Sequence, residues 1–146
     1  MQIMEELGSS ALPAGESFLA AAAVERVGES PALPGTAEAQ AQKARDEALE
    51  KLGIASSMVW GISDSRLVIV RASALGKAKE LSGSHHLMEI TKPLETKKGV
   101  GFGKLGIQLK LFEIPLTVAG KKKDVDELLF TLQQIRQRNR GRWKQA

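Results

Sequence analysis

Two histidines, one aspartate and two serines are the residues whose types could support hydrolysis. The turn Ser63–Ser65 holds Asp64 between two serines, and His85 and His86 follow some twenty residues later. An aspartate orienting a histidine beside a serine is the arrangement of nucleophilic hydrolases. No G-x-S-x-G pattern surrounds either serine, and serines in turns usually cap the backbone. We interpret Asp64 as a carboxylate that closes the turn and pairs with Arg66, and keep a hydrolase using Asp64 with His85 or His86 as an alternative.

The pattern predicts neither a metal site nor a nucleotide site, and no cofactor is expected. Adjacent histidines on a strand point to opposite faces, so His85 and His86 cannot share one metal there. Without cysteine, the chain has no thiolate ligand and no disulfide. Residues 101–106 match G-x-G-x-x-G, but nucleotide binding requires a helix after the glycines and the pattern here predicts a strand.

Lysines flank a glycine-rich loop and precede the last predicted helix. Ammonium groups around an early hairpin loop bind several phosphates at once in some membrane-binding domains, but these lysines fall late in the chain and do not match position by position. The simpler interpretation is solubilising charge at loop tips. The candidate anion or partner contacts are Lys97, Lys98, Lys104, Lys121, Lys122 and Lys123.

The C-terminal residues 136–146 form a basic tail that contains one aromatic ring. Such a run fits phosphate contacts on nucleic acid or headgroup contacts on an anionic membrane, although one tryptophan offers little base stacking. The alternative is a solvated helix end favoured by the helix dipole. The candidate contacts in this tail are Arg136, Arg138, Arg140, Arg142 and Trp143.

Length, composition and charge indicate one soluble domain over 1–146, with its core at about 13–135. The chain is 42% hydrophobic over 146 residues, and residues 1–57 carry a net charge of −5 against +9 for residues 58–146. The first residues are acidic, unlike a signal peptide, and no apolar run approaches the roughly 20 residues that span a bilayer. We therefore expect a cytoplasmic protein.

The expected architecture is a sheet organised around a β-hairpin at 58–71. The first 14 residues are expected to be an irregular lead-in, followed by a strand, a linker and a helix that begins after Thr36 and stops at Gly53. A long loop is expected after the hairpin. The predicted strands are 18–24, 85–88, 91–97, 105–111 and 114–118, the linker is 28–35, the loop is 72–84, and the helices are 37–52 and 125–135.

Two details of these elements carry further expectations. Pro93 favours an edge strand or a bulge, and the turn between the last two strands, near Phe112, has no marker that fixes its position. The last helix is expected to start with a capping box from Asp124 to Glu127 and to pack through an apolar stripe. Past Ile135, the chain is expected to fray into solvent.

The order of strands followed by a terminal helix resembles a pleckstrin-homology-like barrel. Residues 60–91, WGISDSRLVIVRASALGKAKELSGSHHLMEIT, resemble the T-D-R-R-L, K-G-K, L-x-G and P-L-x-E-I run of small bacterial proteins with this barrel, most of them of unknown function. Residues 15–21 are similar to the P-G-E-x-V-L-A opening of their first strand. Two departures are the missing threonine before Asp64 and the His85-His86 pair, where an apolar residue and a proline are commoner.

This resemblance covers about residues 13–135 and implies an α+β seven-stranded antiparallel barrel or sandwich. A C-terminal helix would cap it, and the helix at 37–52 would be inserted after the first strand. The resemblance implies no catalytic residues. We therefore expect a non-catalytic binding or scaffold module that contacts a protein or an anionic membrane surface, with a homo-oligomer left open. A nucleic-acid-associated protein that uses the basic tail is the alternative.

Overall fold

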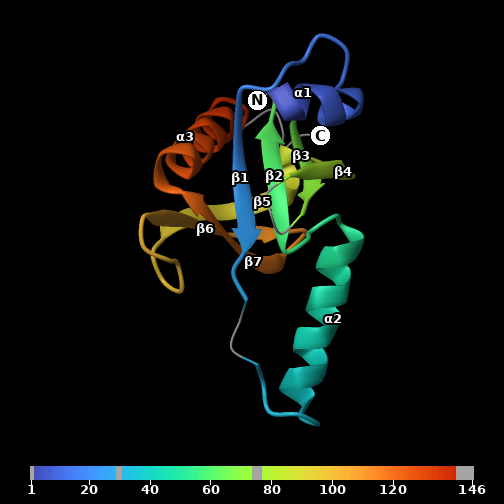
Figure 1. The fold of residues 1–146 in the computed structure, drawn as a ribbon, viewed down its shortest axis with the longest axis vertical. Helices are drawn as coiled ribbons and strands as arrows, with labels where there is room; N and C mark the ends of the chain where they lie inside the picture. Colours follow the sequence, from blue (N-terminus) through green and yellow to red (C-terminus); the bar gives the residue numbers. More distant parts are fainter. Residues whose placement is uncertain (1, 29–30, 74–76, 141–146) are drawn as a thin grey trace.

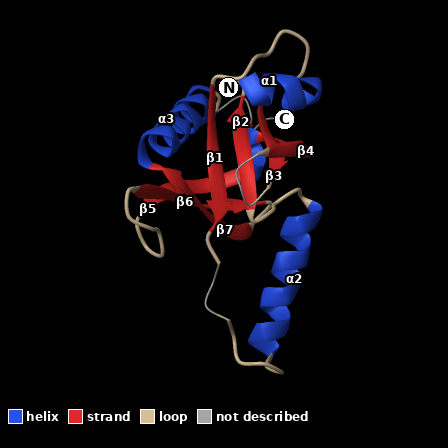
Figure 2. Ribbon diagram, in the orientation of Figure 1, coloured by secondary structure: helices blue, strands red, loops and turns tan. Residues whose placement is uncertain are grey.

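The computed structural model describes residues 2–28, 31–73 and 77–140, which form one antiparallel sheet with three helices (Figure 1 and Figure 2). The strands lie in the order β4-β3-β2-β1-β7-β6-β5, so the predicted α+β class and seven strands are confirmed. The strands are β1 (Ala20–Arg26), β2 (Ser57–Ile62), β3 (Arg66–Ala72), β4 (Ala78–His86), β5 (Ile90–Thr96), β6 (Lys104–Leu111) and β7 (Ile114–Lys121). The helices are α1 (Gln2–Gly8), α2 (Ala37–Lys51) and α3 (Lys122–Arg138), with single 3-10 turns η1 (Ser9–Ala11) and η2 (Leu87–Glu89).

The sheet bends sharply between β1 and β7, which share only two residue pairs, Glu25 with Ala119 and Arg26 with Val118. The strands on either side of this junction cross each other, and α3 covers the space between them (Figure 1). The predicted apolar stripe of α3 is confirmed, since all of its members are buried in the main core. They are Val125, Leu128, Leu129, Leu132 and Ile135.

The central hairpin forms as predicted. β2 pairs with β3 from Met58 opposite Arg71 to Ile62 opposite Leu67. Trp60, at 1% exposure, is the largest fully buried side chain, and its indole N–H donates to the sulfur of Met58 at 3.3 Å. The hairpin therefore supplies the centre of the core as well as the centre of the sheet.

The prediction of an irregular lead-in over the first 14 residues is wrong, because α1 and η1 form there. Met4 is fully buried against Val68 and Val70, on the sheet face opposite the main core, and Phe18 joins this second cluster. A Cβ at Gly61 would lie 2.5 Å from the end of the Met4 side chain, so a larger residue there would force Met4 to shift. Tertiary packing thus stabilises a helix too short to persist alone. The first strand also begins two residues later than predicted, at Ala20.

The helix predicted at 37–52 is confirmed as α2, which begins at the predicted residue and ends one residue earlier, at Lys51. The Thr36 hydroxyl accepts from the Ala39 N–H at 3.1 Å, and Gly53 has a positive φ of 98° just after the helix. Only Leu49 is buried, and α2 extends away from the sheet (Figure 2). In the predicted linker before it, residues 29–30 lie outside the described range.

The predictions for 72–88 are partly wrong. Most of the expected loop at 72–84 is strand β4, which pairs with β3 through two irregularities in register. The predicted strand 85–88 is the end of β4 followed by η2. The sequence pattern did not indicate this strand, because glycines and lysines interrupt its apolar residues. An irregular edge strand does not require alternating apolar residues. Residues 74–76 of the expected loop lie outside the described range.

The structure also places the last turn and the start of α3. β6 and β7 turn at Phe112 and Glu113, which have positive φ values of 49° and 66°. The predicted capping box is wrong: α3 begins two residues before Asp124, and its N-cap residue Lys121 makes no side-chain cap. The expectation that the chain frays directly after Ile135 is wrong as well, because α3 continues to Arg138; residues 141–146 of this expected tail lie outside the described range. In the described residues, no helix is long and apolar enough to cross a membrane.

Burial of the α3 stripe predicts a large effect for Leu128→Asp, since Leu128 is 1% exposed in the main core. Placing a carboxylate there should lower the free energy of unfolding by several kcal/mol and unfold the protein. Phe130→Asp, on the same helix at a side chain that is 59% exposed, is the matched control and should change it by about 0.5 kcal/mol or less. Thermal or urea unfolding compares them, and equal melting temperatures for Leu128→Asp and wild type would contradict this packing.

Candidate anion-binding groove

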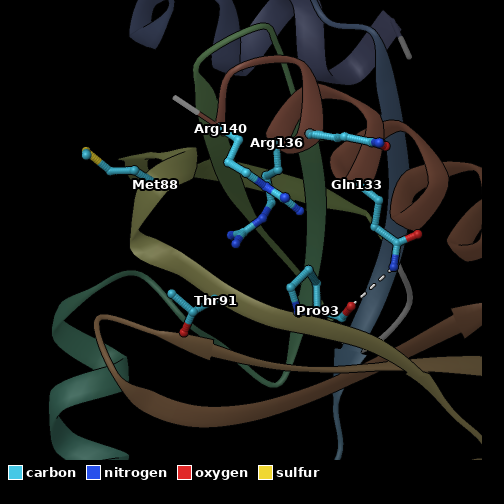
Figure 3. Close-up of a pocket in the computed structure, with 7 residues that line it drawn as sticks. Met88, Thr91, Pro93, Gln133, Arg136 and Arg140 are labelled. Atoms are coloured by element: carbon cyan, nitrogen blue, oxygen red, sulfur yellow. Dashed lines mark hydrogen bonds between the residues drawn. The ribbon is translucent and has the colours of Figure 1, made fainter. Parts of the chain in front are cut away.

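An open groove of about 830 Å³ lies between the C-terminal half of α3 and the edge formed by η2 and β5 (Figure 3). Its lining combines apolar carbon from the edge with polar and cationic groups from the helix. The lining residues are Met88, Thr91, Pro93, Gln133, Arg136, Gln137 and Arg140. Such a mixture suits a ligand that has both an apolar part and a negative charge.

The packing of α3 determines which of its polar side chains face the groove. Gln133, Arg136 and Gln137 follow helical spacing of three or four residues, so they share one face of α3, and Arg140 follows at the same spacing two residues after the helix ends. Ile135 is 2% exposed in the core, and Arg136, the next residue, is therefore drawn to the boundary between core and solvent. The groove face is thus a direct consequence of the buried stripe.

Arg136 is the unusual group in this groove. Its Nη1 atom is buried and has no hydrogen-bond partner among the residues that the structure describes. Burial lowers the pKa of the Arg136 guanidinium, although an arginine stays protonated in proteins. The Arg140 side chain extends into the same part of the groove (Figure 3). Two cationic side chains therefore converge with one donor left unused, which favours an anion such as a carboxylate or a phosphate.

The β5 side of the groove is an interrupted sheet edge, as predicted from Pro93. Lys92 has a positive φ of 51°, and the register with β6 shifts between Thr91 and Leu94. The Pro93 carbonyl accepts from the Gln133 side chain at 3.2 Å (Figure 3). The Thr91 hydroxyl is also buried without a partner, but it points away from the arginines in this view. A bulge and a proline hinder pairing with an added strand, so the groove suits a side chain or chain end better.

The described arginines of the predicted basic tail do not face one common surface. Arg136 and Arg140 face the groove, whereas Arg138 lies elsewhere and binds Asp64 at 2.7 Å. Arg142 and Trp143 lie outside the described residues, so the part of the prediction that rests on them stays untested.

The two predicted groups of lysines, in contrast, lie next to each other. Lys104 is opposite Lys121 in the β6–β7 pair, and the Lys122 N–H donates to the Gly103 carbonyl at 3.4 Å. Lys104 also forms an ion pair with Glu25. The remaining candidates Lys97, Lys98 and Lys123 are exposed at the same end of the molecule as these contacts.

The residues of the hydrolase alternative each have other partners. Asp64 pairs with Arg138, so the predicted pairing with Arg66 is wrong. The His85 Nε2 atom lies 2.5 Å from the Leu52 carbonyl, and the His86 Nδ1 atom accepts from the Met88 N–H at 3.0 Å. Among the described residues there is also no group of three or more side chains that could hold a metal ion.

Sequence reasoning missed five lining residues: Met88, Thr91, Pro93, Gln133 and Gln137. The helical spacing of Gln133 and Gln137 from the two arginines would have indicated this face if the predicted helix had continued beyond Ile135. No signal in the sequence indicated that the β5 edge lies against that face, because this depends on how the sheet bends. The sequence matches no protein-family model and no curated protein, so function must be argued from geometry.

Glu16 holds the turn that follows β2 in place. Its Oε1 atom accepts from the Ser63 hydroxyl at 2.7 Å and from the Ser65 N–H and hydroxyl at 3.0 and 2.8 Å. Partial burial would raise the pKa of Glu16, but the hydrogen bonds from Ser63 and Ser65 and the charge of Arg66 outweigh it and lower this pKa. The fold therefore favours the ionised carboxylate.

The lowered pKa of Glu16 predicts acid-dependent stability. Its contribution is present above the ordinary pKa of 4.5 and is lost as the pH falls through the lower pKa of the folded state. Glu16→Ala should therefore destabilise the protein by roughly 1–2 kcal/mol at pH 7 and by less at low pH. Urea unfolding between pH 3 and 7 measures this, with Glu127→Ala, an exposed residue of α3, as control. A loss independent of pH would contradict the role of the charge.

Proposed function

We propose that this protein is a non-catalytic binding module that recognises an anionic group of a protein partner in the groove beside Arg136. The single observation that carries the proposal is the buried Nη1 atom of Arg136, which lies next to a second arginine and lacks a hydrogen-bond partner within residues 2–28, 31–73 and 77–140. A buried donor without a partner lowers the free energy of unfolding by about 1–3 kcal/mol. We therefore take its presence as support for a ligand that accepts this hydrogen bond.

The proposed family of the module is the pleckstrin-homology-like barrel. Two features support it: the antiparallel strand order β4-β3-β2-β1-β7-β6-β5, and a terminal helix packed across the bend of the sheet. The sequence resemblance of residues 60–91 and 15–21 to small bacterial members supports it as well. Folds of this kind carry many functions, so the binding role itself rests on the groove.

A protein partner fits the groove better than a nucleic acid does. The groove joins a cationic pair to the apolar surface of Met88 and Pro93, which suits a carboxylate or phosphorylated side chain on a polypeptide. A nucleic acid would require a continuous basic run, but Arg138 is engaged by Asp64 and does not face the groove. The interrupted β5 edge favours recognition of one anionic residue over addition of a whole strand.

Binding of a simple anion tests the site. Phenyl phosphate combines a ring with a phosphate, and titrating it into isotopically labelled protein should shift the backbone amides of Thr91 and of residues 133–140. Arg136→Met should weaken this binding about tenfold, because a charge-assisted hydrogen bond is lost. Arg138→Met, on the same helix but outside the groove, should bind like wild type. Shifts that saturate equally in both variants would refute the site.

Arg136→Met should weaken anion binding but should not lower the free energy of unfolding. Methionine retains the apolar stem of Arg136 and removes the buried donor, so the free energy of unfolding should not fall and should rise by up to about 1 kcal/mol. Thermal unfolding of the wild type and of Arg136→Met in a buffer without phosphate measures this. A melting temperature lowered by several degrees would mean that Arg136 serves the fold and not a ligand.

A further inference from the structure

The loop between β5 and β6 holds one aromatic side chain entirely in solvent. Phe102 has an exposure of 108%, so it packs on no other part of the protein. Two tight turns produce this position: the Val100 N–H donates to the Lys97 carbonyl at 3.4 Å, and the Lys104 N–H donates to the Gly101 carbonyl at 3.1 Å. Phe102 lies at the tip of the second turn.

The base of this loop is fastened to the sheet. Val100 packs so closely over Gly106 that a Cβ there would lie 2.9 Å from its side chain. The Gly103 carbonyl accepts from Lys122 at the start of α3, and Lys104 forms an ion pair with Glu25. The base of the loop is therefore held by the sheet and by the start of α3, while the loop itself projects beside β6 (Figure 1).

Six lysines lie in this loop and at the adjoining start of α3. They come from the loop itself and from the junction of β7 with α3, and among the described residues only Lys104 of the six forms an ion pair. The helix dipole disfavours cations at a helix N-terminus, so packing of α3 does not account for the three at its start. These six are Lys97, Lys98, Lys104, Lys121, Lys122 and Lys123.

We propose that this surface, the six lysines with Phe102, docks on an anionic membrane with the phenyl ring inserted among the lipid headgroups. Each lysine near an anionic bilayer adds electrostatic attraction, and burial of the ring adds an apolar contribution. The site lies apart from the groove and does not depend on it. A nucleic acid would satisfy the lysines but would offer this single ring only one stacking partner, so the exposed ring favours lipid.

Vesicle retention tests the proposal with the full chain. Vesicles of phosphatidylcholine with 30% phosphatidylserine should retain the protein, pure phosphatidylcholine should not, and retention should fall as salt rises. Phe102→Ala should weaken retention about tenfold, and Lys97→Gln with Lys98→Gln should weaken it at least tenfold. Phe130→Ala and the pair Lys43→Gln with Lys51→Gln on α2, all exposed residues, are matched controls that should leave it unchanged.

Insertion of the ring has a direct readout. In a Trp143→Phe background, the buried Trp60 gives a constant emission that is subtracted using the Trp143→Phe parent. The remaining emission of Phe102→Trp should shift to the blue and be quenched by brominated lipid, whereas that of Phe130→Trp should do neither. Absence of quenching at position 102, or equal retention of Phe102→Ala and wild type, would overturn the proposal. Retention on DNA that the same lysine changes abolish, without vesicle binding, would also overturn it. Arg136→Met should leave vesicle retention unchanged, which separates this test from that of the groove.

Discussion

The short junction between β1 and β7 is the constraint on which the rest of the fold depends. With only two residue pairs there, the two halves of the sheet cross and leave apolar faces that no strand covers. The five buried side chains of α3 close this gap, and each removes an apolar surface whose burial is worth about 1.5–3 kcal/mol. Because burial fixes the rotation of α3 about its axis, it also fixes where every polar residue of the helix points.

The position of Arg136 shows what this constraint does for the groove. Its neighbour Ile135 must be buried, so the guanidinium is brought into a partly desolvated place where its Nη1 atom has no partner. A residue chosen for stability alone at this boundary would be apolar or fully solvated. Arg138, two residues later, faces another side and is satisfied by an exposed carboxylate, that of Asp64. The two arginines thus differ in burial and in hydrogen bonding, and the binding role proposed for Arg136 rests on that difference.

Local patterns in the sequence predicted the elements that local chemistry determines. The hairpin at 58–71 and α2 carry their own turn and capping residues, and the α3 stripe has clear helical spacing. Where structure depends on distant contacts, prediction failed: α1 forms because Met4 fits over Gly61, and β4 forms because β3 offers an edge. The groove belongs to this second kind, since its two sides come from β5 and α3. The lysines of 97–104 and 121–123 were identified from the sequence, but not that β6 and β7 bring them together.

The two proposed sites lie at opposite ends of one helix. From Lys122 to Arg136 the axis of α3 rises roughly 20 Å, at about 1.5 Å per residue. This exceeds the Debye length of about 8 Å at physiological ionic strength, so the lysines near Phe102 and the arginines of the groove do not repel each other appreciably. Neither proposed site requires α3 to move, so a membrane bound near its N-terminal end would leave the groove near its C-terminal end open. The arrangement therefore suits a module that holds an anionic protein segment beside a membrane surface.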